Sequence, residues 1–163
     1  MQGIFEHQFG RTDSFPLWFA LIAVASATGS MLNARIVMKK GMRWVVVTTY
    51  ATVLALTLLH LGLAVSGLLP PALTFPAHVL WSIALFAMMG LTMGNLNALA
   101  MEPVGHVAGL AASLVSSLAT VGSVVLAIPV GQALDGTNIP LLAGVAAFIA
   151  AALALMRLMP SRG

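Results

Sequence analysis

Long apolar stretches alternate with short polar segments along this chain. Lys, Arg, Asp and Glu do not occur in residues 14–34, 44–101, 103–134 and 136–156. A helix of about 20 apolar residues crosses the ~30 Å hydrocarbon core of a bilayer, so the second stretch is long enough for two crossings and each of the others for one. The pattern therefore predicts five transmembrane helices, at approximately residues 15–38, 44–66, 76–101, 107–130 and 140–159.

Prolines and polar turns mark the ends of the predicted helices. Pro76 is expected to open the third helix and Pro140 the fifth, because a proline in the first turn lacks an N–H that would have no partner there anyway. Pro129 is expected to kink or end the fourth helix. Residues 1–14 mix polar and apolar side chains, so they are predicted to form an extramembrane N-terminal segment of a single membrane domain, residues 1–163.

The composition agrees with an all-α polytopic membrane protein. Of the 163 residues, 60% are hydrophobic and only 7% are charged, whereas a soluble domain contains about 25% charged residues. A soluble enzyme and a nucleic-acid-binding protein are excluded on this ground. The net charge of +3 rests on seven basic and four acidic residues, which is too few to indicate a nucleic-acid partner. The expected surrounding partner is the lipid bilayer.

The basic residues are distributed unequally between the two sides of the membrane. Cytoplasmic segments of membrane proteins are enriched in Lys and Arg, and with the turn between the first two helices in the cytoplasm only Arg11 of the seven lies outside. This predicts an outside N-terminus and a cytoplasmic C-terminus. An outside N-terminus before an odd number of helices further indicates a part of a larger protein. The cytoplasmic basic turn comprises Arg35, Lys39, Lys40, Gly41 and Arg43.

Small and hydroxyl-bearing residues recur on one face of the predicted fourth helix. Their spacings of four and three residues place them on a single stripe of an α-helix. In lipid, such a stripe either allows close contact with another helix or lines an aqueous cavity, and both interpretations stay open here. The stripe consists of Gly105, Gly109, Ser113, Ser116, Thr120 and Ser123.

The predicted third and first helices contain amides that need partners within the membrane. Asn97 and Met93 lie on one stripe of the third helix and Asn95 is offset from it, while Asn33 lies on the polar face of the first helix. An unsatisfied amide in hydrocarbon costs several kcal/mol. These side chains are therefore expected either to form interhelical hydrogen bonds or to contact a substrate beside an adaptable methionine wall.

The sequence offers little for catalysis or metal binding. The four histidines lie on different segments without ligand spacing, and the chain has no cysteine, so neither a metal nor another cofactor is expected and the protein is not predicted to be an enzyme. Proton-coupled transport commonly uses an ionisable residue within the membrane. Glu102, at the cytoplasmic end of the third helix, is the nearest acidic candidate, so a coupling residue is expected in another part of a larger protein.

Three segments resemble one family of membrane carriers. Residues 33–43 (NARIVMKKGMR) look like the basic turn between helices eight and nine of the major facilitator superfamily. Residues 94–109 (GNLNALAMEPVGHVAG) resemble the junction of helices ten and eleven in its drug:proton antiporter branch, of the Bcr/CflA type. Residues 131–137 (GQALDGT) are similar to the outer loop before helix twelve of that family.

This resemblance implies the C-terminal portion, helices eight to twelve, of a carrier in the bacterial inner membrane. Such a carrier exports small amphiphilic or cationic compounds by proton antiport, and this portion alone is expected to lack that activity without the N-terminal helices. The cavity candidates are Asn33, Met93, Asn95, Asn97, Ser113, Ser116 and Thr120. The implied cytoplasmic loop contains Glu102, Pro103, Gly105, His106 and Gly109, and the implied outer loop contains Gly131, Asp135 and Gly136.

A second interpretation belongs to a different class of protein. The chain is then a small self-contained membrane protein that binds another membrane protein, or a half-transporter that works as a dimer. In that case the glycine and serine stripe of the fourth helix is the contact surface, because small residues allow helices to approach closely. Absence of an internal repeat weakens the half-transporter version.

Overall fold

The computed structural model describes residues 2–11 and 13–159, and within these residues the fold is entirely helical. Five long helices follow a short N-terminal one, and a 3₁₀ segment, η1, joins the fourth and fifth helices. The predicted fold class, an all-α polytopic membrane protein, is confirmed. The elements are α1 (Gln2–His7), α2 (Phe15–Lys40), α3 (Met42–Ser66), α4 (Pro71–Met101), η1 (Glu102–Val107), α5 (Ala108–Gln132) and α6 (Ile139–Leu158).

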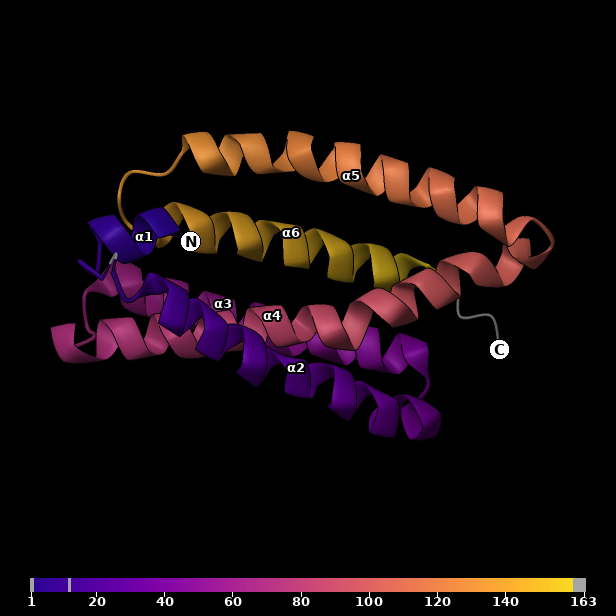
Figure 1. Ribbon diagram of the computed structural model, residues 1–163, viewed down its shortest axis with the longest axis horizontal. Coiled ribbons are helices and arrows are strands. Elements are labelled where there is room, and N and C mark those ends of the chain that lie inside the picture. Colours follow the sequence, from indigo (N-terminus) through magenta and orange to yellow (C-terminus); the bar gives the residue numbers. More distant parts are fainter. Residues whose placement is uncertain (1, 12, 160–163) are drawn as a thin grey trace.

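Four segments of the described chain are long and apolar enough to cross a membrane, and one of them, Pro71–Gln132, is 62 residues long. At 1.5 Å per residue it would measure about 90 Å as a straight helix, roughly three times the hydrocarbon core. The backbone turns within η1, where Val104 has the non-helical angles φ −123° and ψ 26°. Figure 1 shows α5 running back along the molecule from this turn, so α4 and α5 are separate helices.

The helix ends differ from the sequence prediction at two prolines. α4 begins at Pro71 rather than at Pro76, which lies inside the helix, so the prediction that Pro76 opens it was wrong. Pro71 already supplies the favourable first-turn proline, and Pro76 costs only one backbone hydrogen bond near an exposed end. Likewise Pro129 does not end α5, which continues to Gln132.

Four helices form the packed part of the molecule, in the spatial order α2, α4, α3, α6. Small residues set the approach of α2 to α4: a Cβ atom on Gly29 would lie 2.6 Å from the carbonyl oxygen of Ala87, and one on Gly90 would lie 2.7 Å from Ser30 Oγ. The two backbones are in contact here, as is common between helices in membranes. On the other side, α6 buries one stripe against α3, formed by Leu142, Ala146, Ile149, Leu153 and Met156.

An aromatic core closes one end of the bundle, called here the α1 end. Phe5 of α1 is 1% exposed and packs with Ile22 and Val79. Its ring makes edge contacts with Phe15 and Phe75, at centroid distances of 5.2 and 5.5 Å. The N-terminal segment is therefore folded against the bundle. The opposite end, which contains the basic turn between α2 and α3, is called here the basic end.

Candidate functional site

Helix α5 differs from the other long helices because none of its side chains is buried. In Figure 1 it runs along the upper edge, apart from α2 and α3, and contacts α4 and α6. Three hydroxyl groups of its predicted stripe donate to carbonyl oxygens of their own helix: Ser113 to Leu110, Thr120 to Ser116 and Ser123 to Thr120, each at 2.8 Å. These three groups are therefore satisfied within the helix, and the stripe is exposed.

Three different faces run along α5. Ala111 and Gly122 are half-buried and Val115 lines a cavity beside α4 and α6, so these residues define the side toward the bundle. At about 100° per residue, the centre of the hydroxyl stripe lies roughly 140° around the helix from these residues, although its edge at Ser123 is only about 80° from Val115. A third side is occupied by the exposed aliphatic residues Leu110, Leu114 and Val121, whereas Leu118, which is 72% exposed, lies on the same side as Ala111 and Gly122. The stripe is therefore a face of α5 distinct from the centres of these two sides.

A cavity of about 510 Å³ lies between α4, α5 and α6 toward the basic end. It brings together Asn97 of the predicted cavity, Arg43 of the basic turn, and Glu102 and Pro103 of the predicted cytoplasmic loop. The guanidinium of Arg43 donates to the carbonyl oxygens of Met156, at 2.7 Å, and Met159. These are carbonyls at the end of α6 that lack helical partners, so Arg43 joins the basic turn to the last helix.

The amides of Asn33 and Asn95 are bonded to each other across the α2–α4 contact. Asn95 Nδ2 donates to Asn33 Oδ1 at 2.7 Å and to the carbonyl oxygen of Leu91 at 2.8 Å. Asn95 is buried, whereas Asn97 and Met93 are exposed on α4. The sequence left two interpretations open for these amides, an interhelical hydrogen bond or contact with a substrate. Asn33 and Asn95 form the interhelical hydrogen bond.

Replacing the Asn33–Asn95 pair tests its contribution to stability. We expect Asn33→Leu, Asn95→Leu and the double variant to give a coupling free energy of about 1 kcal/mol, in the range of other interhelical hydrogen bonds in membranes. Reversible unfolding in mixed micelles measures it. Asn97→Leu is the matched control on the same helix and is expected to leave the free energy of unfolding nearly unchanged. A coupling energy near zero would contradict a stabilising bond.

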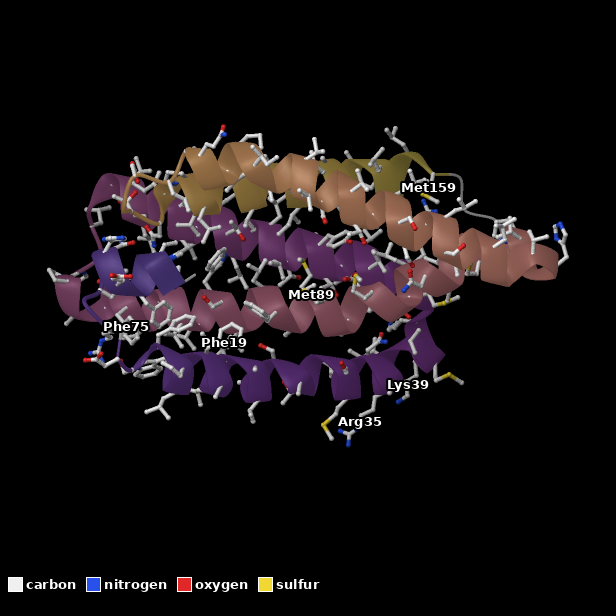
Figure 2. The ribbon with its side chains drawn as sticks, turned by 45° about the horizontal axis from the view of Figure 1, so that its top comes forward. Phe19, Arg35, Lys39, Phe75, Met89 and Met159 are labelled. Atoms are coloured by element: carbon white, nitrogen blue, oxygen red, sulfur yellow. The ribbon has the colours of Figure 1, made fainter. Side chains whose placement is uncertain are left out.

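The remaining predicted residues lie near the surface. Arg35 and Lys39 point away from the bundle in Figure 2, and Lys40 Nζ lies 5.6 Å from the ring centroid of Trp44. Gly41, at a φ of +81°, forms the turn that separates α2 from α3, a conformation that glycine adopts without strain. The exposed residues Gly105, His106, Gly109, Ser116 and Gly131 do not join the cavity near the basic end.

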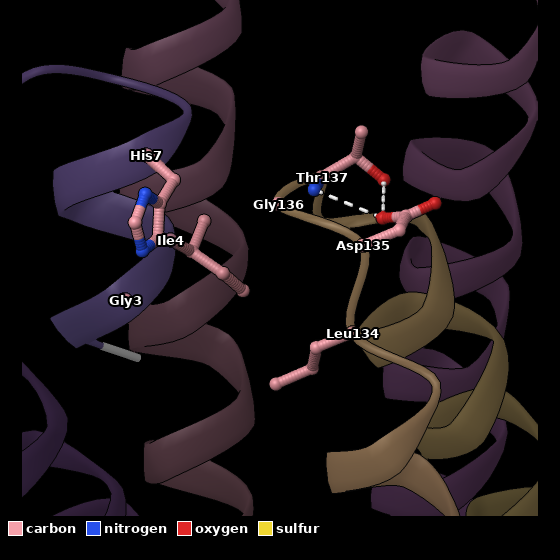
Figure 3. Close-up of a pocket in the computed structure, with 7 residues that line it drawn as sticks. All are labelled: Gly3, Ile4, His7, Leu134, Asp135, Gly136 and Thr137. Carbon is pink, nitrogen blue, oxygen red and sulfur yellow. Dashed lines mark hydrogen bonds between the residues drawn. The ribbon is translucent and has the colours of Figure 1, made fainter.

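A second pocket of about 510 Å³ lies at the α1 end, between α1 and the loop before α6. Figure 3 shows His7 and Ile4 on one side and Asp135, Gly136 and Thr137 on the other. Asp135 Oδ1 accepts hydrogen bonds from Thr137 N, at 3.0 Å, and Thr137 Oγ1, at 2.7 Å. These bonds hold the pKa of the Asp135 carboxyl below its usual range.

Two histidines that the sequence assigned to unrelated positions lie together at the α1 end. The ring centroids of His60 on α3 and His78 on α4 are 6.0 Å apart. Trp81 lies beside both rings and its Nε1 donates to Thr57 Oγ1 at 3.0 Å. The hairpin register was the signal for this pair, because the two histidines are nearly equidistant from the short loop between α3 and α4.

The described residues contain no group of three or more His, Asp or Glu side chains that could hold a metal ion. Comparisons with protein-family models, with curated proteins and with solved structures found no match. The family resemblance of the loop segments is therefore a prediction from this sequence alone.

Proposed function

We propose that these helices are part of a membrane carrier like the drug:proton antiporters of the major facilitator superfamily, with the hydroxyl stripe of α5 beside the substrate pathway. The observation that carries the proposal is that none of the side chains of this 25-residue helix is buried. A helix between lipid and bundle needs no third, polar face. A substrate pathway adjoining that face accounts for it.

The chemistry of the stripe supports a cavity wall. The hydroxyl groups of Ser113, Thr120 and Ser123 donate to their own helix, as Ser123 does to the carbonyl oxygen of Thr120 at 2.8 Å. Water or a polar substrate can therefore bind to the stripe and dissociate from it without leaving a hydroxyl donor unsatisfied. An unsatisfied donor inside a membrane would be costly in free energy. The small side chains also leave room for another helix to move past α5. In carriers, one group of helices rocks against the other around a site near the membrane midplane.

The cavity near the basic end supports a small, largely apolar substrate. Its apolar walls include Leu96, Met156 and Met159, and its charged lining residues are Glu102 and Arg43, whose guanidinium is bonded to carbonyl oxygens at the end of α6. Methionine side chains adapt to ligands of different shapes, and Met89 and Met93 are exposed on the same helix as Leu96. The corresponding location is the bacterial inner membrane, with the basic end in the cytoplasm.

The test is to substitute the stripe at its chromosomal locus in the organism that produces the protein. Ser113→Leu and Ser116→Leu are expected to abolish most export of ethidium, a small amphiphilic cation, because leucine narrows the pathway and removes its hydroxyl groups. Membrane levels of the protein are expected to stay normal. Fluorescence of ethidium retained by the cells, together with an immunoblot of the membrane fraction, measures both quantities.

Val121→Leu is the matched control, because it introduces the same residue on the aliphatic side of α5, where Val121 is 65% exposed. It should leave export unchanged. If the stripe variants leave ethidium export unchanged and reduce the membrane level of the protein or the amount of a partner that copurifies with it, the proposal that the protein is a carrier is contradicted. That result would instead support a packing surface for another membrane protein or a second copy of this chain.

A further inference from the structure

The most unusual buried group in the described chain is the imidazole of His78. The residue is fully buried, and neither Nδ1 nor Nε2 has a hydrogen-bond partner among the described residues. Buried polar atoms almost always have a partner, so an exception in a folded protein needs an explanation. An ionisable side chain within a membrane segment is moreover rare and usually functional.

Aromatic rings surround His78 on several sides. The centroids of Phe9 and Trp81 both lie 5.4 Å from that of His78, and those of His60 and Phe5 lie 6.0 and 6.1 Å away. Phe5 and Phe9 come from α1 and the residues after it, so the N-terminal segment forms the cover over His78. Figure 1 shows α1 at this end of the bundle. The cover belongs to a different element from α3 and α4, which carry His60 and His78.

His60 is the titratable neighbour in ring contact with His78. Its Nε2 lies 3.4 Å from Asn138 Nδ2 at the start of α6. In the chain, Asn138 follows Thr137, a residue of the pocket at the α1 end. On α2 and α6 the charged residues lie toward the opposite end, at Arg35, Lys39, Lys40 and Arg157. The other charged or titratable residues at the α1 end are Glu6, His7, Arg11, Asp13 and Asp135, all exposed.

We propose that His78, with His60 as its neighbour, is a proton-binding site in which proton uptake displaces α1 from the end of the bundle. Under the closed cover, an imidazolium would be a buried charge with no hydrogen-bond acceptor, which is strongly unfavourable. A proton therefore binds at a ring nitrogen of His78 when α1 moves and water reaches the ring. Because the open form binds the proton more tightly, lowering the pH shifts the equilibrium toward that form.

The site would give the molecule an ionisable group within the membrane that does not depend on Asp or Glu. Histidine is suited to this role because its charge changes near physiological pH. Use of the site to drive export rests on the proposed carrier function, whereas proton binding itself does not. The two are therefore tested separately, with proton binding measured on the purified full chain rather than by transport.

The fluorescence of Trp81 reports the protonation state of its two histidine neighbours. The chain contains three tryptophans, so Trp18→Phe and Trp44→Phe leave Trp81 as the single emitter. An imidazolium quenches indole emission more strongly than a neutral imidazole does. We expect acidification to cause a reversible loss of Trp81 emission, and His78→Phe, which keeps an aromatic ring but cannot bind a proton, to remove that transition. Replacing His60 by Phe should shift its midpoint.

Two exposed histidines supply matched controls. His7→Gln and His106→Gln, in the same single-tryptophan background, should leave the transition unchanged because neither ring contacts Trp81 or His78 in the described structure. A transition that persists in His78→Phe, or that is lost in either control, would overturn the proposal. A response that disappears on addition of EDTA would also overturn it, because the signal would then report a metal ion.

Amide hydrogen exchange of the unsubstituted protein keeps the proposal testable if the variants do not fold. After correction for the intrinsic effect of pH on exchange, acidification should accelerate exchange in α1 and leave α6 protected. Protection of α1 that is the same before and after acidification would overturn the proposed displacement. Loss of ethidium export in the stripe variants has no bearing on either measurement, so failure of the carrier function and failure of the proton site are distinguishable.

Discussion

Replacing Gly29 by valine is expected to destabilise the packed helices by about 2 kcal/mol or more. The valine Cβ would lie 2.6 Å from the carbonyl oxygen of Ala87 and 3.1 Å from its Cα. These are backbone atoms, which cannot rotate away as the tip of a side chain does, so α2 and α4 must separate. Overpacking of this kind costs about 1–3 kcal/mol even where side chains can adjust. Reversible unfolding in mixed micelles measures the loss.

Gly94→Val on α4 is the control for this experiment. A Cβ atom on Gly94 meets nothing within 4 Å, so the same substitution there should change the free energy of unfolding by less than about 0.5 kcal/mol. Equal losses for the two variants would mean that the α2–α4 contact is not the source of the effect. Because the Asn33–Asn95 bond spans the same contact, Gly29→Val should also abolish the coupling energy of that pair.

Replacing Phe5 by alanine is expected to release α1 from the end of the bundle. Phe5 is 1% exposed and its ring lies 5.2–6.2 Å from those of Phe9, Phe15, Phe75 and His78. Truncating a fully buried phenylalanine costs about 3–5 kcal/mol, which exceeds what a six-residue helix contributes by itself. Amide hydrogen exchange should show loss of protection in residues 2–11, with α3 and α6 unchanged.

Phe148→Ala provides the comparison, because Phe148 on α6 is 39% exposed. This variant should retain protection in residues 2–11, as in the unsubstituted protein. If Phe5→Ala leaves α1 protected, the segment is held by contacts other than the aromatic core, and the cover over His78 must be reconsidered.

The positions of the long helices were predictable from the sequence because a membrane-spanning segment needs both apolar side chains and a fully hydrogen-bonded backbone. Backbone N–H and C=O groups within the hydrocarbon core must form their hydrogen bonds with each other. Each charge-free stretch therefore becomes one or two helices of nearly the predicted length. α3 ends at Ser66 and α4 at Met101, as expected. The start of α4 was missed because Pro71 and Pro76 are equally acceptable early in a helix, and only packing distinguishes them.

The partners of side chains were far less predictable. Asn95 bonds to a residue 62 positions earlier, and its choice depends on how closely Gly29 and Gly90 allow α2 and α4 to approach. Arg43 contacts the end of α6, which no local pattern indicates. Docking of α1 rests on Phe5 and Phe9, and two aromatic residues in a short polar segment are too few to show a helical period. The histidine pair required the register of the α3–α4 hairpin.

The contacts of Arg43 have a consequence for biosynthesis. Its acceptors, Met156 and Met159, are 113 and 116 residues further along the chain. During translation α2 and α3, which flank the basic turn, therefore enter the membrane long before the partners of Arg43 exist. The stripe of α3 that receives α6 must meanwhile be shielded by lipid or by the insertion machinery. Contacts between such distant residues form late and slowly. The contacts between Arg43 and α6 at the basic end can therefore form only after the ribosome has synthesised α6.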